Sequence, residues 1–329
     1  MLHLTPPPGS RQHGPVAGSL AGIHPLREGP FVVPLPARAS HRPRRSVRLI
    51  AVTALATLAL TQVGVAPAQA RLPEPLEVTT VAVTVDVDGR SFRARVTYPL
   101  VGRDHPAVAF GHAYLQGPER YARLLEAVAA QGFVVVAPAS ESSFWPSHSR
   151  LAKDLRRSLT WLVEQSHTSG SPLAGKVDER RLAVAGHSMG GGAAVIAAVR
   201  DPRVRAIATL AAAETVPATS LAAAGLDVPS LWVAGSADRI VPPDTTRALL
   251  AASPAPTLLA VVEGGWHCGF ADSSAFWGFG CDSGALPRAE QQATTADLLV
   301  RWLAASLLGE PTDVTGVDGV GYEPDESAD

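Results

Sequence analysis

A strand, a sharp turn and a helix follow one another in the stretch Arg181-Leu-Ala-Val-Ala-Gly-His-Ser-Met-Gly190. Residues 182–185 form a short apolar run that predicts a buried strand, and the Ala- and Val-rich residues 189–199 predict a helix. The turn between them has the pattern G-x-S-x-G, centred on Ser188. In this context the turn exposes the serine hydroxyl, and the two glycines prevent collisions on either side. The stretch therefore predicts a nucleophilic serine at the end of a strand.

Apolar strands alternate with helical patterns on both sides of this stretch. Short strands without a polar face are typical of a mostly parallel sheet that helices cover on both sides, so we predict an α/β fold. Two alternating segments around Asp88-Gly89 predict an opening hairpin. The expected strands are 78–87, 91–98, 107–110, 133–137, 181–185, 204–210, 230–234 and 257–262, and the expected helices are 118–131, 149–165, 189–199, 244–252 and 288–307.

A base and an acid are expected to accompany the serine. A serine hydroxyl is a weak nucleophile unless a base takes its proton, and the base needs a group that orients it. Only one histidine follows Ser188, and this residue, His267, lies in a loop after a predicted strand. Asp238 follows the preceding predicted strand and is the expected acid. Asp244 is the alternative, but it follows two prolines and resembles a helix N-cap.

Two backbone N–H groups are expected to bind the oxyanion of an acyl-transfer intermediate. One belongs to the residue after the nucleophile, which is Met189. The other comes from the loop after the third strand, which reads Phe110-Gly-His-Ala-Tyr114, and we assign it to Tyr114.

These residues together resemble a known family. The segments 175–192, 228–238 and 263–267 are similar to cutinase-type polyester hydrolases, including PET-degrading enzymes, and to dienelactone-hydrolase and chlorophyllase relatives. The resemblance runs from about residue 76 to residue 307 and implies an α/β-hydrolase fold. It also implies a carboxylic ester hydrolase that uses Ser188, Asp238 and His267 through an acyl-enzyme, without a metal or a cofactor. The implied substrate is a small or polymeric ester.

The sequence departs from this family at two points. Bacterial polyester hydrolases of this type carry a tryptophan after the strand that follows the nucleophile helix, but residues 211–217 contain no aromatic side chain. A dienelactone hydrolase would carry a cysteine in place of the serine. Four side chains are candidate substrate contacts: Tyr114, His187, Trp266 and Trp145.

Other functions remain open at this point. The segment between the strands 204–210 and 230–234 has about 20 residues, which is too short for a large lid, so we expect an open cleft. A lipase, a peptidase or a chlorophyllase-like hydrolase is the alternative. A non-catalytic binding protein on the same fold is a further alternative, which the complete set of catalytic residues disfavours.

The ends of the chain differ from its centre. The 329 residues are 46% hydrophobic, which is globular composition, and a net charge of −2 gives no indication of nucleic acid or of an anionic membrane surface. We expect residues 1–40 to be a disordered extension, 41–70 a signal peptide and 71–309 the catalytic domain. Residues 310–329 carry seven acids and no base, and we expect a disordered tail.

The expected signal peptide has a cationic block, an apolar run over 49–60 and the cleavage pattern Ala68-Gln69-Ala70. An uncleaved anchor is the alternative, although a membrane span needs about 20 apolar residues. We therefore expect a secreted monomer that begins near Arg71 and has no stable membrane association. In an exported protein Cys268 and Cys281 are expected to form a disulfide, and two thiols are too few for a zinc site.

Overall fold

The computed structural model describes residues 72–254, 256–274 and 281–324 of the chain. The expected N-terminal extension and the expected signal peptide lie outside these residues. Within the described part, no helix is both long enough and apolar enough to cross a membrane.

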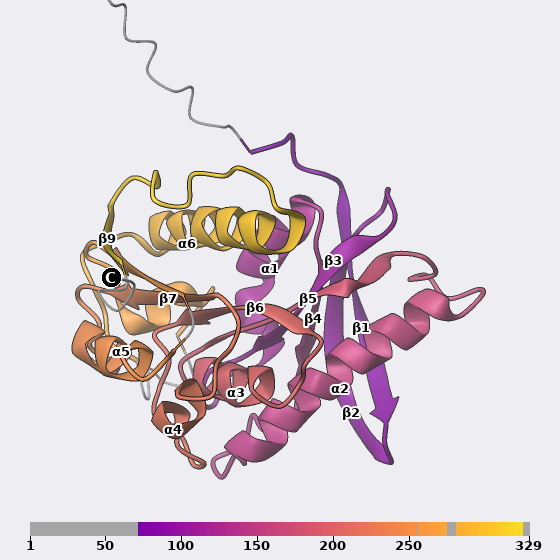
Figure 1. The fold of residues 1–329 in the computed structure, drawn as a ribbon, viewed down its shortest axis with the longest axis horizontal. Helices are drawn as coiled ribbons and strands as arrows, with labels where there is room; N and C mark the ends of the chain where they lie inside the picture. Colours follow the sequence, from indigo (N-terminus) through magenta and orange to yellow (C-terminus); the bar gives the residue numbers. More distant parts are fainter. Residues whose placement is uncertain (1–71, 255, 275–280, 325–329) are drawn as a thin grey trace, which may run out of the picture. The chain divides into compact units, whose positions relative to one another are not determined.

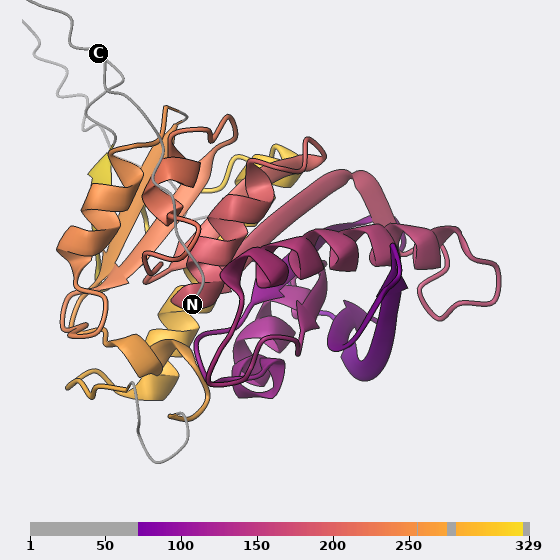
Figure 2. The same ribbon diagram turned by 90° about the horizontal axis from the view of Figure 1, so that it is seen from below.

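One nine-stranded sheet forms the centre of the described structure (Figure 1), in the order β1-β2-β4-β3-β5-β6-β7-β8-β9. The strands from β4 to β8 along this order run parallel, whereas β2 is antiparallel to both of its neighbours and β9 is antiparallel to β8. Figure 2 shows the N-terminal hairpin at one end of the sheet and the C-terminal strands at the other. The strands are β1 Val78–Val87, β2 Arg90–Pro99, β3 His105–Gly111, β4 Val134–Pro138, β5 Val177–His187, β6 Val204–Leu210, β7 Ser230–Gly235, β8 Thr257–Val262 and β9 Val320–Pro324.

Helices cover both faces of the sheet, because its central strands are apolar on both sides. One buried cluster joins the sheet to α2, α3, α4 and α5, and a second cluster joins it to α1 and α6. This arrangement is the α/β-hydrolase fold that the sequence predicted. The helices are α1 Ala122–Ala130, α2 His148–His167, α3 Met189–Ala198, α4 Thr219–Ala223, α5 Pro243–Leu250 and α6 Arg288–Leu303, with 3₁₀ turns at Pro118–Tyr121 and His267–Phe270 and a π turn at Ala304–Leu308.

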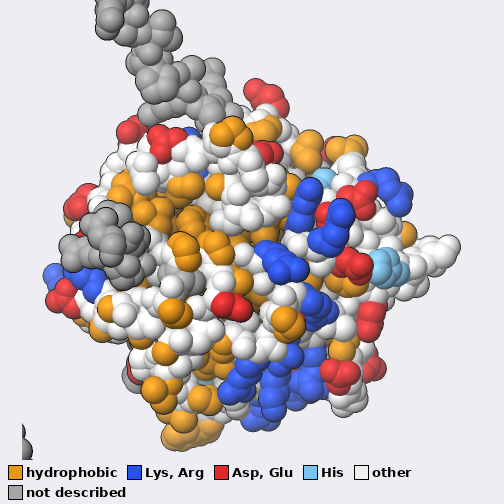
Figure 3. Space-filling model, in the orientation of Figure 1, with side chains coloured by type: hydrophobic (Ala, Val, Ile, Leu, Met, Phe, Trp, Pro, Cys, Tyr) orange, Lys and Arg blue, Asp and Glu red, His pale blue; other side chains and the backbone are white. Residues whose placement is uncertain are grey.

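The amphipathic pattern of α2 shows why the sequence folds in this way. Its leucines at spacings of three and four residues, Leu151, Leu155, Leu159 and Leu162, are all fully buried. Figure 3 shows that Lys and Arg side chains gather over α2 on the exposed face of the molecule. Arg150 and Arg156 form ion pairs with Glu141 and Asp201 outside the helix, whereas Arg157 pairs with Asp154 within it.

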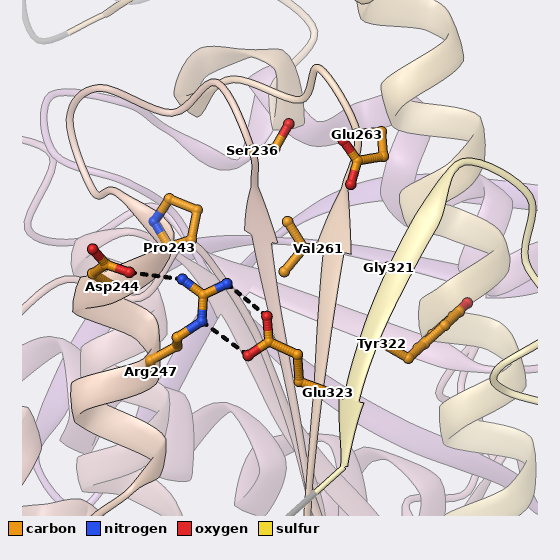
Figure 4. Close-up of a pocket in the computed structure, with 9 residues that line it drawn as sticks. All are labelled: Ser236, Pro243, Asp244, Arg247, Val261, Glu263, Gly321, Tyr322 and Glu323. Atoms are coloured by element: carbon orange, nitrogen blue, oxygen red, sulfur yellow. Dashed lines mark hydrogen bonds and ion pairs between the residues drawn. The ribbon is translucent and has the colours of Figure 1, made fainter.

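The expectation of a disordered acidic tail over 310–329 is wrong for the described residues 310–324. Residues Val320–Pro324 form β9, which pairs with residues 258–262 of β8 and covers that edge of the sheet. Glu323 also forms a bidentate ion pair with Arg247 of α5, with distances of 2.6 and 2.9 Å (Figure 4). Composition showed the acids of this segment but not the apolar side chains between them, such as Val317, which is buried.

Truncating the chain after Gly309 therefore tests the role of β9. Its removal exposes the edge of β8 and the apolar surface under Val317. We expect a loss of at least about 2 kcal/mol in the free energy of unfolding, comparable to exposing one buried valine. The melting temperature should fall by about 5 °C in calorimetry. A chain that ends at Pro324 keeps β9 and is the control. Equal melting temperatures for the two truncated chains would contradict a stabilising role.

Candidate active site

The turn between β5 and α3 holds Ser188 in a strained backbone conformation. Its φ of +55° and ψ of −119° lie outside the regions that ordinary residues adopt, and such strain concentrates at functional positions. The backbone is tightly packed within this turn. A Cβ atom at Gly186 would lie 2.3 Å from the carbonyl oxygen of Gly190. The glycines expected at both positions are therefore a steric requirement.

The end of β3 lies directly against the same turn. A Cβ atom at Gly190 would come within 2.2 Å of the carbonyl oxygen of Gly111. This contact brings the loop after Gly111 beside the N-terminus of α3, where Met189 is the first helical residue and its N–H has no acceptor within the helix. The N–H of Ala113 donates to the Tyr121 hydroxyl at 3.1 Å, so it is occupied. The two loops that should supply the oxyanion donors are thus adjacent.

A buried His–Asp pair lies at the ends of β7 and β8. The Nδ1 atom of His267 is 2.8 Å from one carboxylate oxygen of Asp238, and both side chains are almost fully buried. The other oxygen accepts the backbone N–H groups of Ile240 and Val241 at 2.9 and 2.8 Å. A carboxylate only accepts hydrogen bonds, so the ring keeps its proton on Nδ1 and leaves Nε2 as the acceptor.

Asp244 lies elsewhere. Its side chain is 92% exposed and is 2.7 Å from Arg247 in the same helix. The expectation that Asp244 caps this helix is wrong, because α5 already begins at Pro243 and Asp244 occupies its first turn. An exposed carboxylate paired with an arginine has no contact through which to orient His267.

Three side chains that the sequence did not single out hold the loop around His267. Asp282 accepts the backbone N–H groups of His267, Cys268 and Arg239 at 3.2, 3.3 and 3.0 Å. Gln291 of α6 accepts the N–H of Trp266 at 3.0 Å and donates to its carbonyl at 2.9 Å. From the same helix, Arg288 donates to the carbonyl oxygens of Cys268 and Ala271. These partners are 14 to 43 residues away along the chain, so local sequence patterns could not identify them.

The predicted disulfide is present. It joins Cys268 to Cys281 across a sequence separation of 13, with a Cα–Cα distance of 5.4 Å. The bond therefore starts at the residue after His267 and ends at the residue before Asp282. The disulfide thus keeps Asp282 close to the His267 loop, whose backbone N–H groups the Asp282 carboxylate accepts.

The four expected substrate contacts divide into two groups. Tyr114 and Trp145 are 38% and 91% exposed, and the Tyr114 hydroxyl donates to the carbonyl oxygen of Phe144 at 3.0 Å, next to Trp145. The side chains of His187 and Trp266 are buried, and their role as substrate contacts stays a prediction. His187 precedes the serine and so points into the core. The guanidinium carbon of Arg288, at the start of α6, lies 4.7 Å from the ring centroid of Trp266.

A separate cavity lies between α5, β8 and β9 (Figure 4) and has a volume of about 420 Å³. Arg247 forms ion pairs with Asp244 and Glu323 in its lining, and Ser188, Asp238 and His267 are not among the lining residues. Among the described residues, no group of three or more His, Cys, Asp or Glu side chains could hold a metal ion.

The fold, the strained serine turn and the buried His–Asp pair define a protein of the α/β-hydrolase class. A family model described as PET hydrolase-like matches residues 59–253. The chain belongs to this PET hydrolase-like family. The matched range includes Ser188 and Asp238 and ends before His267, so the place of His267 rests on the geometry alone.

Curated relatives of the chain carry the name cutinase. Cutinase est1 of Thermobifida alba is 29% identical over 147 residues, which cover 45% of this chain and 47% of the relative. Cutinase 2 of Thermobifida cellulosilytica is 32% identical over 111 residues, which cover 34% of this chain and 41% of the relative. Cutinase cut1 of Thermobifida fusca is also 32% identical over 111 residues, or 34% of each chain. The chain thus spans less than half the length of these relatives.

The choice between the two aspartates can be tested by isosteric substitution. Asp238→Asn should lower kcat for a soluble ester by about four orders of magnitude, because an amide can donate to Nδ1 and favours the wrong tautomer of His267. Asp244→Asn removes only an exposed ion pair and should change kcat less than twofold. Steady-state kinetics of both variants decide the matter, and the reverse order of effects would refute the assignment.

The disulfide should stabilise both the fold and the catalytic loop. Replacing both cysteines by serine opens a loop of about 15 residues and should cost about 3 kcal/mol. The melting temperature should then fall by about 6–12 °C. We also expect a lower kcat, because Asp282 is no longer tethered beside His267. Intact mass with and without reductant verifies the bond in the wild type. If the double-serine variant kept both its stability and its kcat, the disulfide would not stabilise the fold or the loop around His267.

Proposed function

We propose that this protein hydrolyses carboxylic esters, with Ser188 as nucleophile, His267 as base and Asp238 as the acid that orients it. The observation that carries the proposal is the buried contact of 2.8 Å between His267 and Asp238, in a fold that presents a strained serine. The names of the relatives, which are cutinases, support the same activity.

The residues of the site suffice for acyl transfer. The Ser188 Oγ attacks the ester carbonyl carbon while His267 Nε2 accepts the hydroxyl proton, and Asp238 stabilises the imidazolium that forms. The N–H groups of Met189 and Tyr114 stabilise the oxyanion, typically by about 2.7–4 kcal/mol for each donor. His267 then returns the proton to the departing alcohol, which leaves an acyl-enzyme. A water molecule, activated by the same base, releases the acid and regenerates Ser188.

The proposed substrates are small and polymeric esters. The described segment between β6 and β7 contains one helix, the five-residue α4. This segment therefore holds no large lid. Tyr114 and Trp145 offer exposed aromatic surface for the acyl part of the ester. We further propose that the chain is exported, starts near Arg71 after cleavage and acts as a monomer outside the cell. N-terminal sequencing of exported protein and its mass in solution test these points.

Ser188→Ala is the decisive variant, because it removes one hydroxyl group and nothing else. Hydrolysis of short p-nitrophenyl esters should fall at least a thousandfold, since removal of such a serine typically costs about a millionfold in kcat. Circular dichroism should be unchanged. Ser220→Ala, on α4, is the control and should keep full activity. Retention of more than about a thousandth of the wild-type rate would exclude Ser188 as the nucleophile.

The substrate class needs a separate comparison with the wild-type protein. Soluble short-chain esters, a triglyceride emulsion and a polyester film would be offered under the same conditions. Release of acid from the film favours a polyester hydrolase, and faster turnover of the emulsion favours a lipase. A protein that hydrolyses none of the three would contradict the proposed activity.

A further inference from the structure

A buried tyrosine connects the two halves of the candidate site. Tyr121 is fully buried, and its hydroxyl has one partner in the loop after β3 and another at the end of β5. It accepts the backbone N–H of Ala113 at 3.1 Å and lies 2.8 Å from Nδ1 of His187. The first partner belongs to the loop that carries the proposed oxyanion donor Tyr114. The second immediately precedes Ser188.

The donors can be assigned from this pair of contacts. An amide N–H can only donate, so the Tyr121 oxygen accepts from Ala113. If His187 Nδ1 also donated to Tyr121, the buried phenolic proton would lack an acceptor among these partners, which typically costs about 1–3 kcal/mol. With Tyr121 donating to Nδ1, fewer buried groups are left unpaired: only Nε2 of His187 has no hydrogen-bond partner, whereas the reverse arrangement also strands the phenolic proton. His187 is then a neutral ring that carries its proton on Nε2.

Electrostatics agrees with two neutral partners. Burial lowers the pKa of His187 well below its usual range, and the neighbouring His267 lowers it further. Burial likewise raises the pKa of the Tyr121 hydroxyl. The Ala113 N–H therefore donates to Tyr121, and Tyr121 to His187, across the ordinary pH range.

The ring of His187 passes this constraint on to the proposed base. It packs against the ring of His267 with a centroid distance of 4.6 Å and against Phe270 at 5.3 Å. It also meets the ring of Tyr121 edge-on, with a centroid distance of 5.9 Å. His187 is thus enclosed between the tyrosine that hydrogen-bonds it and the imidazole that should accept the serine proton.

We propose that Tyr121 is a positioning residue, which holds the oxyanion loop through Ala113 and the His267 ring through His187. This inference rests on the proposed ester hydrolysis for its kinetic consequence, but the hydrogen-bond arrangement does not. It also gives a supporting role to the buried His187, expected as a substrate contact, because its ring packs against that of His267.

Tyr121→Phe removes the hydroxyl and keeps the ring, which packs 4.9 Å from Phe110. The variant leaves the Ala113 N–H and His187 Nδ1 without their partner, so the loop and the ring should both shift. A displacement of about 1 Å in a catalytic site can cost about a hundredfold in rate. We expect kcat for a soluble ester to fall by about 10- to 100-fold. KM should change less than about twofold, because a buried side chain does not touch the substrate.

Tyr322→Phe is the matched control. Its hydroxyl accepts a backbone N–H, that of Val317, at 3.3 Å, but it lies on β9 away from the site. Tyr322→Phe should lose less stability than Tyr121→Phe, because Tyr322 is half-buried and loses one hydrogen bond, and it should keep its kcat. Equal kcat values in the two variants would overturn the positioning role. Loss confined to KM would overturn it as well.

A spectroscopic measurement tests the arrangement independently of activity. Long-range ¹H–¹⁵N spectra of the full chain, assigned with a His187→Gln variant, should show His187 as the Nε2-protonated tautomer in the wild type. In Tyr121→Phe the ¹⁵N resonance of Nδ1 should shift, because the hydrogen bond to this nitrogen is lost. A His187 ring protonated on Nδ1 in the wild type would refute the inference. Failure of the wild type to hydrolyse any ester would instead refute the proposed function.

Discussion

The close approach of three backbone segments at the turn after β5 is the constraint on which the candidate site depends. Gly186, Gly190 and Gly111 leave no room for a Cβ atom where β3, β5 and the start of α3 meet. This contact forces Ser188 into its unusual conformation and brings the loop after β3 beside the first N–H of α3. A side chain at any of these glycines would separate the proposed nucleophile from the proposed oxyanion donors.

The proposed base is held in place by a much more distributed set of contacts. Asp238 holds one ring nitrogen of His267, while Asp282 and Gln291 bind the backbone on either side. The disulfide tethers the same loop, and the ring of His187 packs against the imidazole. A loop needs such support because ordering each of its residues costs about 1–2 kcal/mol. Precision at His267 is thus achieved by many moderate interactions, in contrast to the steric constraint at Ser188.

Strong local patterns were sufficient for most of the fold. The eight strands expected from the sequence are all present, and β1, β6 and β8 have the bounds expected for them. The expected helix over 118–131 is divided at Tyr121, where a 3₁₀ turn gives way to α1, because that side chain turns inward to meet Ala113. β9 was missed, since a short strand of mixed polarity becomes stable only by pairing with an edge that already exists.

The sequence by itself determined the strand–turn–helix around Ser188, the order of serine, aspartate and histidine along the chain, and the pairing of the two cysteines. These features have short-range signals: periodicity, glycine spacing and residue count. Only the tertiary structure decided which aspartate meets His267, since both candidates follow the same strand and differ in burial. It alone revealed Tyr121, Asp282 and Gln291, whose partners are eight or more residues away along the chain. Such contacts depend on how loops from separate strands converge, and no periodicity in the sequence records that convergence.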